Sequence, residues 1–200
     1  MQRLGRQYPH VGYGPRFKQW LTSERSQPYY SYGNGAAMRV SPCAYVGKTL
    51  SEVQDLAKVV TAVSHNHPEG LLGAQAEVTA IFLARQGEEK SKIRQVLTSH
   101  YYALDFTLEE IRSTYRFDAS CQGALPQAIM AFLQANSFEE TIRNAVFIGG
   151  DSDTIAAMAG EISGAYYGIP KEMSIAVQAY LPKPLQTLLE EFEQTFMIEK

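Results

Sequence analysis

The chain has 200 residues, of which 45% are hydrophobic and 20% charged, and its formal net charge is −3. These values are typical of a single globular domain, and a slightly acidic chain with scattered Lys and Arg argues against binding to nucleic acid. No apolar stretch approaches the ~20 residues of a membrane span, so no membrane partner is expected.

The cysteines and the first residues bear on the cellular compartment. Cys43 and Cys121 lack the spacing of a metal site, and we expect both to be reduced, buried and small hydrophobic residues. The first ten residues have no apolar core of the kind that a signal peptide carries. The expected location is therefore the cytoplasm.

The first segment with a possible role in binding is the tripeptide Gly33-Asn34-Gly35, which stands ahead of small residues that could begin a helix. Glycines let a backbone approach a ligand closely and expose N–H donors. The Asn34 side chain can both donate and accept hydrogen bonds. The same tripeptide is also typical of a simple turn, and the residues alone leave both interpretations open.

Helical periodicity dominates from residue 50 onward. Leu50–Ser64 carries apolar residues at three- and four-residue spacing, with Ser51 placed to cap the helix and Glu52 in its first turn. Five further helices are predicted at Gly73–Arg85, Lys90–Thr98, Ser120–Ala135, Ser137–Ala145 and Thr154–Tyr167, followed by two C-terminal segments broken by Pro182 and Pro184. No run alternates as a strand would, so we predict a single all-α domain over residues 1–200, a bundle of about eight to ten helices.

The loop from Ser64 to Gly70 concentrates polar side chains between two predicted helices. His65 and His67 stand two residues apart and could bind zinc, but no third ligand stands nearby. Two other roles remain open: ring N–H groups that cap a helix end, and contact with a substrate.

The segment from Ser120 to Gly123 opens another predicted helix with small and amide residues. Pro126 follows closely, and because proline has no N–H it is expected within the first turn of that helix. By itself the segment indicates the start of a helix.

Two carboxylates and a hydroxyl follow two glycines at Gly149-Gly150-Asp151-Ser-Asp153-Thr154. Positions i and i+2 lie about 200° apart on a helix, so Asp151 and Asp153 converge only if Asp151 precedes or caps the helix. Hard oxygen ligands of this kind suit Mg²⁺ or Mn²⁺. Alternatively, one aspartate is an N-cap and the other is solvated.

The helix after these aspartates carries Ala156, Gly160 and Gly164 on one stripe. Glycine costs about 1 kcal/mol inside a helix, so something is expected to approach that face closely. We therefore predict that this helix is central to the bundle.

Four segments in this order along the chain resemble the ADP-ribosylglycohydrolase family, which includes the dinitrogenase-reductase-activating glycohydrolase and the ADP-ribosylarginine hydrolases. The segments are residues 31–42, 64–70, 120–123 and 149–157. The resemblance runs from about Arg6 to about Leu181. It implies an all-α fold, a dinuclear Mg²⁺ or Mn²⁺ centre, and hydrolysis of the bond between C1″ of ADP-ribose and a modified protein side chain, often arginine. The implied partner is an ADP-ribosylated protein or a small molecule that contains ADP-ribose.

The resemblance also implies roles for individual residues. Three residues match metal ligands of the family, namely Asp151, Asp153 and Thr154. The residues that match positions beside the substrate are Gly33, Asn34, Gly35, Met38, His65 or His67, and the segment from Ser120 to Gly123. The resemblance assigns no catalytic residue in this chain.

The chain departs from the family at its start. Family members begin with a Gly-Asp-x-x-Gly segment and a Thr-Asp-Asp-Thr segment that supplies further metal ligands, and this chain has neither. Its first residues resemble the part that follows them, so an N-terminally truncated version of the fold with weak or absent metal binding is expected. The alternative function is therefore a catalytically impaired or inactive relative that binds ADP-ribose or is structural. Uncovered apolar surface also makes self-association a hypothesis.

Overall fold

The computed structural model describes residues 1–25 and 27–196, and within these ranges the regular structure is helical. The first half comprises α1 (Gln2–Gln7), α2 (Pro15–Thr22), the 3₁₀ helix η1 (Asn34–Ala36), α3 (Ser41–Val46), α4 (Leu50–Ala62), α5 (Pro68–Arg85) and α6 (Lys90–His100). The second half comprises α7 (Leu108–Arg112), α8 (Cys121–Leu133), α9 (Phe138–Phe147), α10 (Ser152–Tyr167), α11 (Lys171–Gln178) and α12 (Lys183–Thr195). The all-α prediction is confirmed. None of the described helices is long and apolar enough to cross a membrane.

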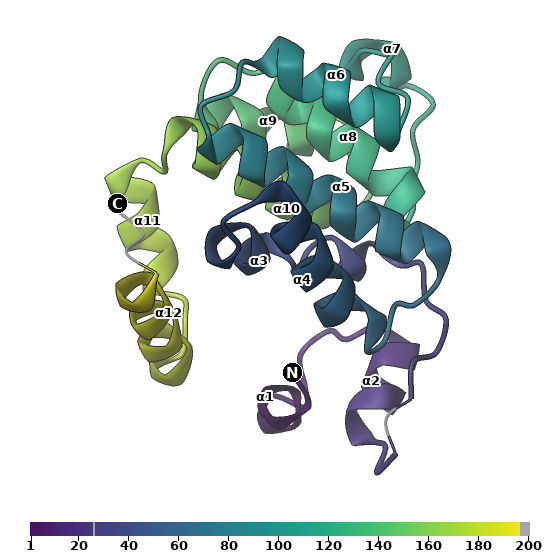
Figure 1. Cartoon of the computed structure of the whole chain (residues 1–200), viewed down its shortest axis with the longest axis vertical. Helices are drawn as coiled ribbons and strands as arrows, with labels where there is room; N and C mark the ends of the chain where they lie inside the picture. Colours follow the sequence, from purple (N-terminus) through teal and green to yellow (C-terminus); the bar gives the residue numbers. More distant parts are fainter. Residues whose placement is uncertain (26, 197–200) are drawn as a thin grey trace.

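The helix α10 packs against α5, α8 and α9 at the centre of the bundle. Figure 1 shows α6 and α7 at one end of the molecule, α1 and α2 at the other, and α11 with α12 standing beside the bundle. A Cβ atom added to Gly160 would come within 3.2 Å of Ile142 Cδ1 on α9. The predicted central position of this helix and the close approach at its glycine stripe are confirmed.

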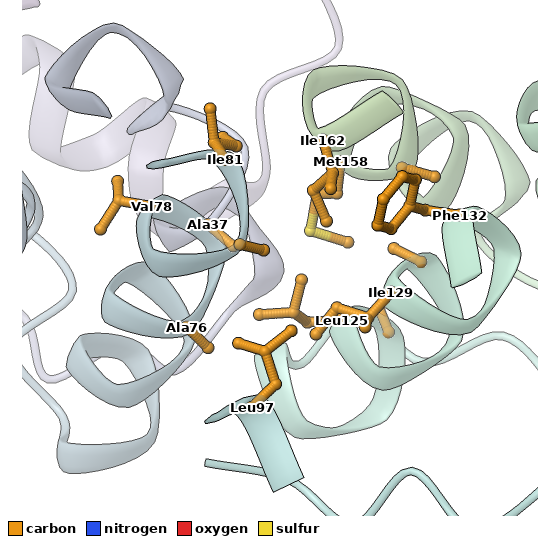
Figure 2. Packing of buried hydrophobic residues seen from close by; sticks show 14 of the residues in the cluster. Ala37, Ala76, Val78, Ile81, Leu97, Leu125, Ile129, Phe132, Met158 and Ile162 are labelled. Carbon is orange, nitrogen blue, oxygen red and sulfur yellow. The ribbon is translucent and has the colours of Figure 1, made fainter. Parts of the chain in front are cut away.

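The hydrophobic core lies between α5, α8 and α10 (Figure 2). Its large, fully buried side chains include Ile81, Leu97, Leu125, Ile129, Phe132, Met158 and Ile162. Leu97 comes from α6 and the others lie at helical spacing on α5, α8 and α10, so their packing fixes how these three helices are placed relative to one another.

The cap of α4 and the start of α5 differ from the prediction, whereas α4 begins at Leu50 as predicted. The N-cap of α4 is Thr49 and not Ser51, because the Thr49 hydroxyl accepts from the backbone N–H of Glu52 at 3.2 Å. The helix α5 begins at Pro68, earlier than predicted. The φ angle of proline is fixed near the helical value, which suits Pro68 to the first turn of a helix.

The prediction that Pro126 lies in the first turn of its helix is wrong. The Ser120 hydroxyl caps α8 by accepting from Gly123 N at 3.1 Å, so α8 begins at Cys121 and Pro126 falls inside it. Proline there cannot donate to the carbonyl of Gln122. Nearby, the Tyr115 hydroxyl donates to Gly123 O at 2.9 Å and ties the preceding loop to this part of α8.

Two glutamates face each other in the interior between α5 and α10. Glu77 is completely buried, and neither of its carboxyl oxygens has a hydrogen-bond donor among the described residues. Glu161 on α10 is the acidic neighbour of Glu77, and Ser41 on α3 lies near Glu161. Burial raises the pKa of both carboxyl groups, that of Glu161 to about 8. The two carboxyls can satisfy each other only if one carries a proton.

This pair makes stability depend on pH. A group whose pKa is raised by folding contributes stability that is present below its unfolded value of 4.5 and is lost as pH rises through its folded value, here about 8 for Glu161. We expect Glu77→Gln, which donates to Glu161 without a titrating proton, to be more stable than the wild type at pH 8.5 by about 1–3 kcal/mol.

The measurement is urea unfolding between pH 5 and pH 9. Glu172→Gln on the exposed face of α11 is the matched control and should keep the wild-type dependence. Parallel curves for the wild type and Glu77→Gln would contradict a shared proton.

Candidate functional site

The segment around Gly33 lies beside the start of α8. Asn34 N donates to Ala119 O at 2.8 Å, and Cys121 N donates to Tyr32 O at 2.9 Å. The Cys121 thiol also donates to Gly33 O at 3.3 Å. Two of the segments singled out in the sequence are therefore joined by backbone hydrogen bonds.

His65 lies beneath the two glycines of this segment. Its side chain is 5% exposed, and its Nε2 atom lies 3.6 Å from where a Cβ atom of Gly33 would stand and 3.8 Å from that of Gly35. Arg39 Nη1 donates to the Ser64 hydroxyl at 2.8 Å, and this hydroxyl lies 2.8 Å from His65 Nδ1. Because the hydroxyl accepts from Arg39, its own proton is available for Nδ1, which places the His65 proton on Nε2, facing the glycines.

The charge state of His65 follows from its surroundings. Burial and, to a smaller extent, the positive charges of Arg39 and Arg16 together lower the pKa of its imidazole to about 3. The ring is thus a neutral N–H donor at physiological pH.

His67 has a different role from His65. It is the N-cap of α5, where its Nδ1 atom accepts from Glu69 N at 3.1 Å. Its ring packs edge-on against Tyr30 and Tyr32, with centroids 4.6 and 5.1 Å away. A histidine does cap a helix end here, but it does so with a nitrogen that accepts and not with an N–H group as proposed.

A hollow of about 310 Å³ opens beside these residues. It is lined by Arg16, Ser31, Tyr32, Gly33, Asp118, Ala119 and Ser120. Gly33 and Ser120 were predicted as site residues from the sequence. Arg16 and Asp118 were not, because each lies in a segment without a recognisable pattern. Met38, after η1, is 36% exposed and does not line the hollow.

Gly123 acts through its lack of a side chain. A Cβ atom there would lie 2.0 Å from Asp118 Oδ2, so only glycine lets the Asp118 carboxylate lie across the first turn of α8. Asp118 Oδ1 accepts from Ser120 N at 2.8 Å. Gly123 therefore shapes the wall of the hollow and does not itself line it.

The aspartates lie at the start of α10, as the spacing predicts. Gly149 and Gly150 have φ angles of +73° and +69°, which only glycine adopts readily. Asp151 is the N-cap residue, but its carboxylate makes no capping hydrogen bond; instead Asp151 Oδ2 accepts from Asn34 Nδ2 at 2.6 Å. The interpretation of Asp151 as a simple capping side chain is thus wrong.

The donors at this helix start fit a hard cation in type. Asp153 is exposed, and its Oδ1 atom accepts from the N–H of Thr154, which follows it in the first turn and is buried. These residues offer two carboxylates and one hydroxyl, the oxygen ligands that Mg²⁺ or Mn²⁺ takes. Each such cation binds about six oxygens, and in the described part of the chain no three His, Cys, Asp or Glu side chains form a metal-binding group.

Comparison with known proteins places these features in context. A family model described as ADP-ribosylglycohydrolase matches residues 4–197. The ADP-ribosylhydrolase ARH3 of Homo sapiens is 28% identical over 82% of this chain and 56% of its own length. The ADP-ribosylarginine hydrolase Tri1 of Pseudomonas putida is 27% identical over 68% of this chain and 39% of its own length.

The chain spans about half the length of the curated relatives that it matches. A solved structure described as an ADP-ribosylglycohydrolase-related protein complex has a TM-score of 0.69 and 22% identity, over 98% of this chain and 69% of that chain. At this identity the likeness establishes the fold.

The neutral state of His65 leads to a testable pH dependence. Because its pKa is about 3 in the folded chain and 6.5 in the unfolded one, only the unfolded chain takes up a proton between these values, and stability falls as pH falls below 6.5. Relative to His65→Asn, which cannot titrate, the wild type should lose about 2 kcal/mol between pH 7.5 and pH 5.

Urea unfolding at pH 5, 6 and 7.5 measures this loss. His100→Gln, at an exposed position at the end of α6, should retain the wild-type slope. If His65→Asn also retains it, then the buried ring is already charged and the tautomer assigned above fails.

Proposed function

Because the chain belongs to the ADP-ribosylglycohydrolase family, we propose that it hydrolyses the bond between C1″ of ADP-ribose and a modified protein side chain or small molecule, with Mg²⁺ or Mn²⁺ as cofactor. The metal ligands are Asp151, Asp153 and Thr154. The substrate lies along Gly33, Asn34, Gly35, His65 and the start of α8.

One observation carries this proposal: Asn34 contacts both groups of residues. Its backbone N–H is bonded to Ala119 beside the hollow, and its side chain donates to Asp151 at 2.6 Å. Segments that lie far apart in the sequence thus meet at a single residue. Such convergence of glycines, a neutral histidine and the carboxylate of Asp151 is typical of an active site and supports the family function at this place.

The charges around the hollow suit a substrate with an anionic diphosphate. Arg16 lines the hollow, and Arg39 lies behind Gly35, whose carbonyl accepts from Arg39 Nε at 2.6 Å. Neither arginine forms a salt bridge within the described residues. Although Asp118 lines the same hollow, neither arginine is paired with it, and their positive charge favours a phosphorylated ligand beside the partly exposed backbone of the glycine segment.

The chain's own residues have separate tasks in the proposed reaction. The Nε2–H group of His65 orients an oxygen of the substrate at the glycine segment, and Tyr32 and Ser120 close the hollow around the nucleotide. Asp151, Asp153 and Thr154 hold the cofactor at the start of α10. A bound divalent cation supplies charge that lowers the pKa of water and so produces a nucleophile.

A second function, binding of ADP-ribose without hydrolysis, is favoured by the small number of metal ligands. Three side chains leave most of a cation's shell to water, which weakens binding. Such a chain would keep the hollow and His65 and would recognise the ligand without cleaving it.

The experiment is release of ADP-ribose from an ADP-ribosylated arginine peptide in the presence of Mg²⁺. We expect release by the wild type, about 10–100-fold slower release by Asp153→Ala because a ligand is lost, and no release with EDTA. Asp105→Ala, an exposed aspartate in the loop before α7, is the matched control and should keep full activity.

Calorimetry with free ADP-ribose separates the two functions. Binding without release would support the non-catalytic relative. Equal release by the wild type and Asp153→Ala, in EDTA as in Mg²⁺, would rule out the metal assignment, and absence of both binding and release would overturn both functions.

A further inference from the structure

We infer that Asn34 is a positioning residue, whose amide holds the Asp151 carboxylate in the orientation from which it binds a cation. This partly buried contact joins the glycine segment to the start of α10. The role of this contact in cation binding rests on the proposed function, whereas the contact itself can be tested without any cation.

The first argument is that Asp151 forgoes the usual interaction of its position. An aspartate at an N-cap accepts from the free backbone N–H groups of its own helix. Asp151 accepts none of them, and the left-handed backbone at Gly149 and Gly150 precedes it. Its carboxylate turns instead to Asn34, so this contact replaces the helix cap.

The second argument is that Asn34 is the fixed partner. Its side chain is 8% exposed, its N–H donates to Ala119 O, and its carbonyl accepts from the N–H groups of Ala37 and Met38 at 2.9 and 3.1 Å. A backbone held on both sides leaves the amide few orientations. The direction of the Asp151 carboxylate therefore depends on Asn34 and not the reverse.

The third argument concerns the kind of donor. An amide is neutral, so it orients the carboxylate without cancelling the negative charge that a cation needs, whereas lysine or arginine would cancel it. Within the described residues the second oxygen, Asp151 Oδ1, accepts no hydrogen bond from the protein. One oxygen is thus used for positioning, and the other is left for a ligand.

A double-mutant cycle in EDTA at pH 7.5 tests the contact by itself. Asn34→Asp places two carboxylates together and should lower the urea midpoint. The double variant Asn34→Asp with Asp151→Asn exchanges donor and acceptor, and it should recover at least tenfold in the unfolding equilibrium constant relative to Asn34→Asp. Additive effects of the two substitutions would overturn the inference.

Mn²⁺ affinity, measured by calorimetry, supplies the readout that a merely structural contact would not change. We expect Asn34→Ala to bind Mn²⁺ about tenfold more weakly than the wild type. The exchanged double variant should also bind weakly although its stability recovers, because its amide at position 151 carries no charge.

Asn144→Ala is the matched control, because Asn144 Nδ2 also makes a partly buried hydrogen bond, to Ala131 O at 3.2 Å, near the C-terminal end of α8 and not at its start. It should lower the urea midpoint and leave Mn²⁺ affinity unchanged. Wild-type affinity in Asn34→Ala would overturn the positioning role. A wild-type chain that takes up no Mn²⁺ would contradict the proposed function and not the contact, which the metal-free cycle decides separately.

Discussion

The N-terminal ends of α5, α8 and α10 pack closely around one short segment, residues 31–36. This packing determines where the polar groups of the candidate site lie. A Cβ atom on Gly73 of α5 would come 2.7 Å from the Cys121 side chain at the start of α8, so these two helices approach as closely as they do only because that position is glycine. The start of α10 reaches the same segment through Asp151 and Asn34. Three amino-terminal helix ends with their partial positive charges therefore lie around residues 31–36. Arg16 and Arg39, which form no salt bridge within the described residues, add to this field, and the Asp118 carboxylate at the start of α8 opposes it.

Two pairs of carboxyl groups in the chain differ in the donors around them. At the start of α10, Asp151 accepts from an amide and Asp153 accepts from a backbone N–H. Glu77, which lies midway along α5, has no donor among the described residues and can be satisfied only by sharing a proton with Glu161. The first pair can stay charged at the helix start, where we propose that a cation binds, and the second excludes charge from the core. Both pairs lie on or beside α10, so the central helix carries charge at its start and avoids it in its interior.

The long helices could be predicted from the sequence because their apolar residues repeat over several turns, as in α4 and α10. The short helices α1, α2 and α7 could not, since five to eight residues carry too little periodicity. Pro126 lies inside α8 because Ser120 is the capping residue. The sequence contains this serine but does not show that the helix begins directly after it. No sequence pattern indicated the roles of Glu77 and Arg16, because the spacing of residues along one helix does not show which residues of other elements pack against it. The site residues were found together by resemblance to a family, whereas their contacts, above all that of Asn34 with Asp151, required the fold.

The double attachment of Asn34 has a consequence for how ligands bind. Its backbone belongs to the segment beside the hollow, and its side chain sets the direction of a proposed metal ligand. A ligand that shifts Gly33 or Gly35 therefore shifts the amide that orients Asp151, and a cation that draws the carboxylate away pulls on the same residue. Because coupling between two binding sites is reciprocal, any effect of a cation on affinity for a nucleotide must equal the effect of the nucleotide on affinity for the cation. The backbone of Asn34 is hydrogen-bonded to Ala119 on one side and to Ala37 and Met38 on the other. A displacement of this segment would therefore move the backbone and the side-chain amide of Asn34 together.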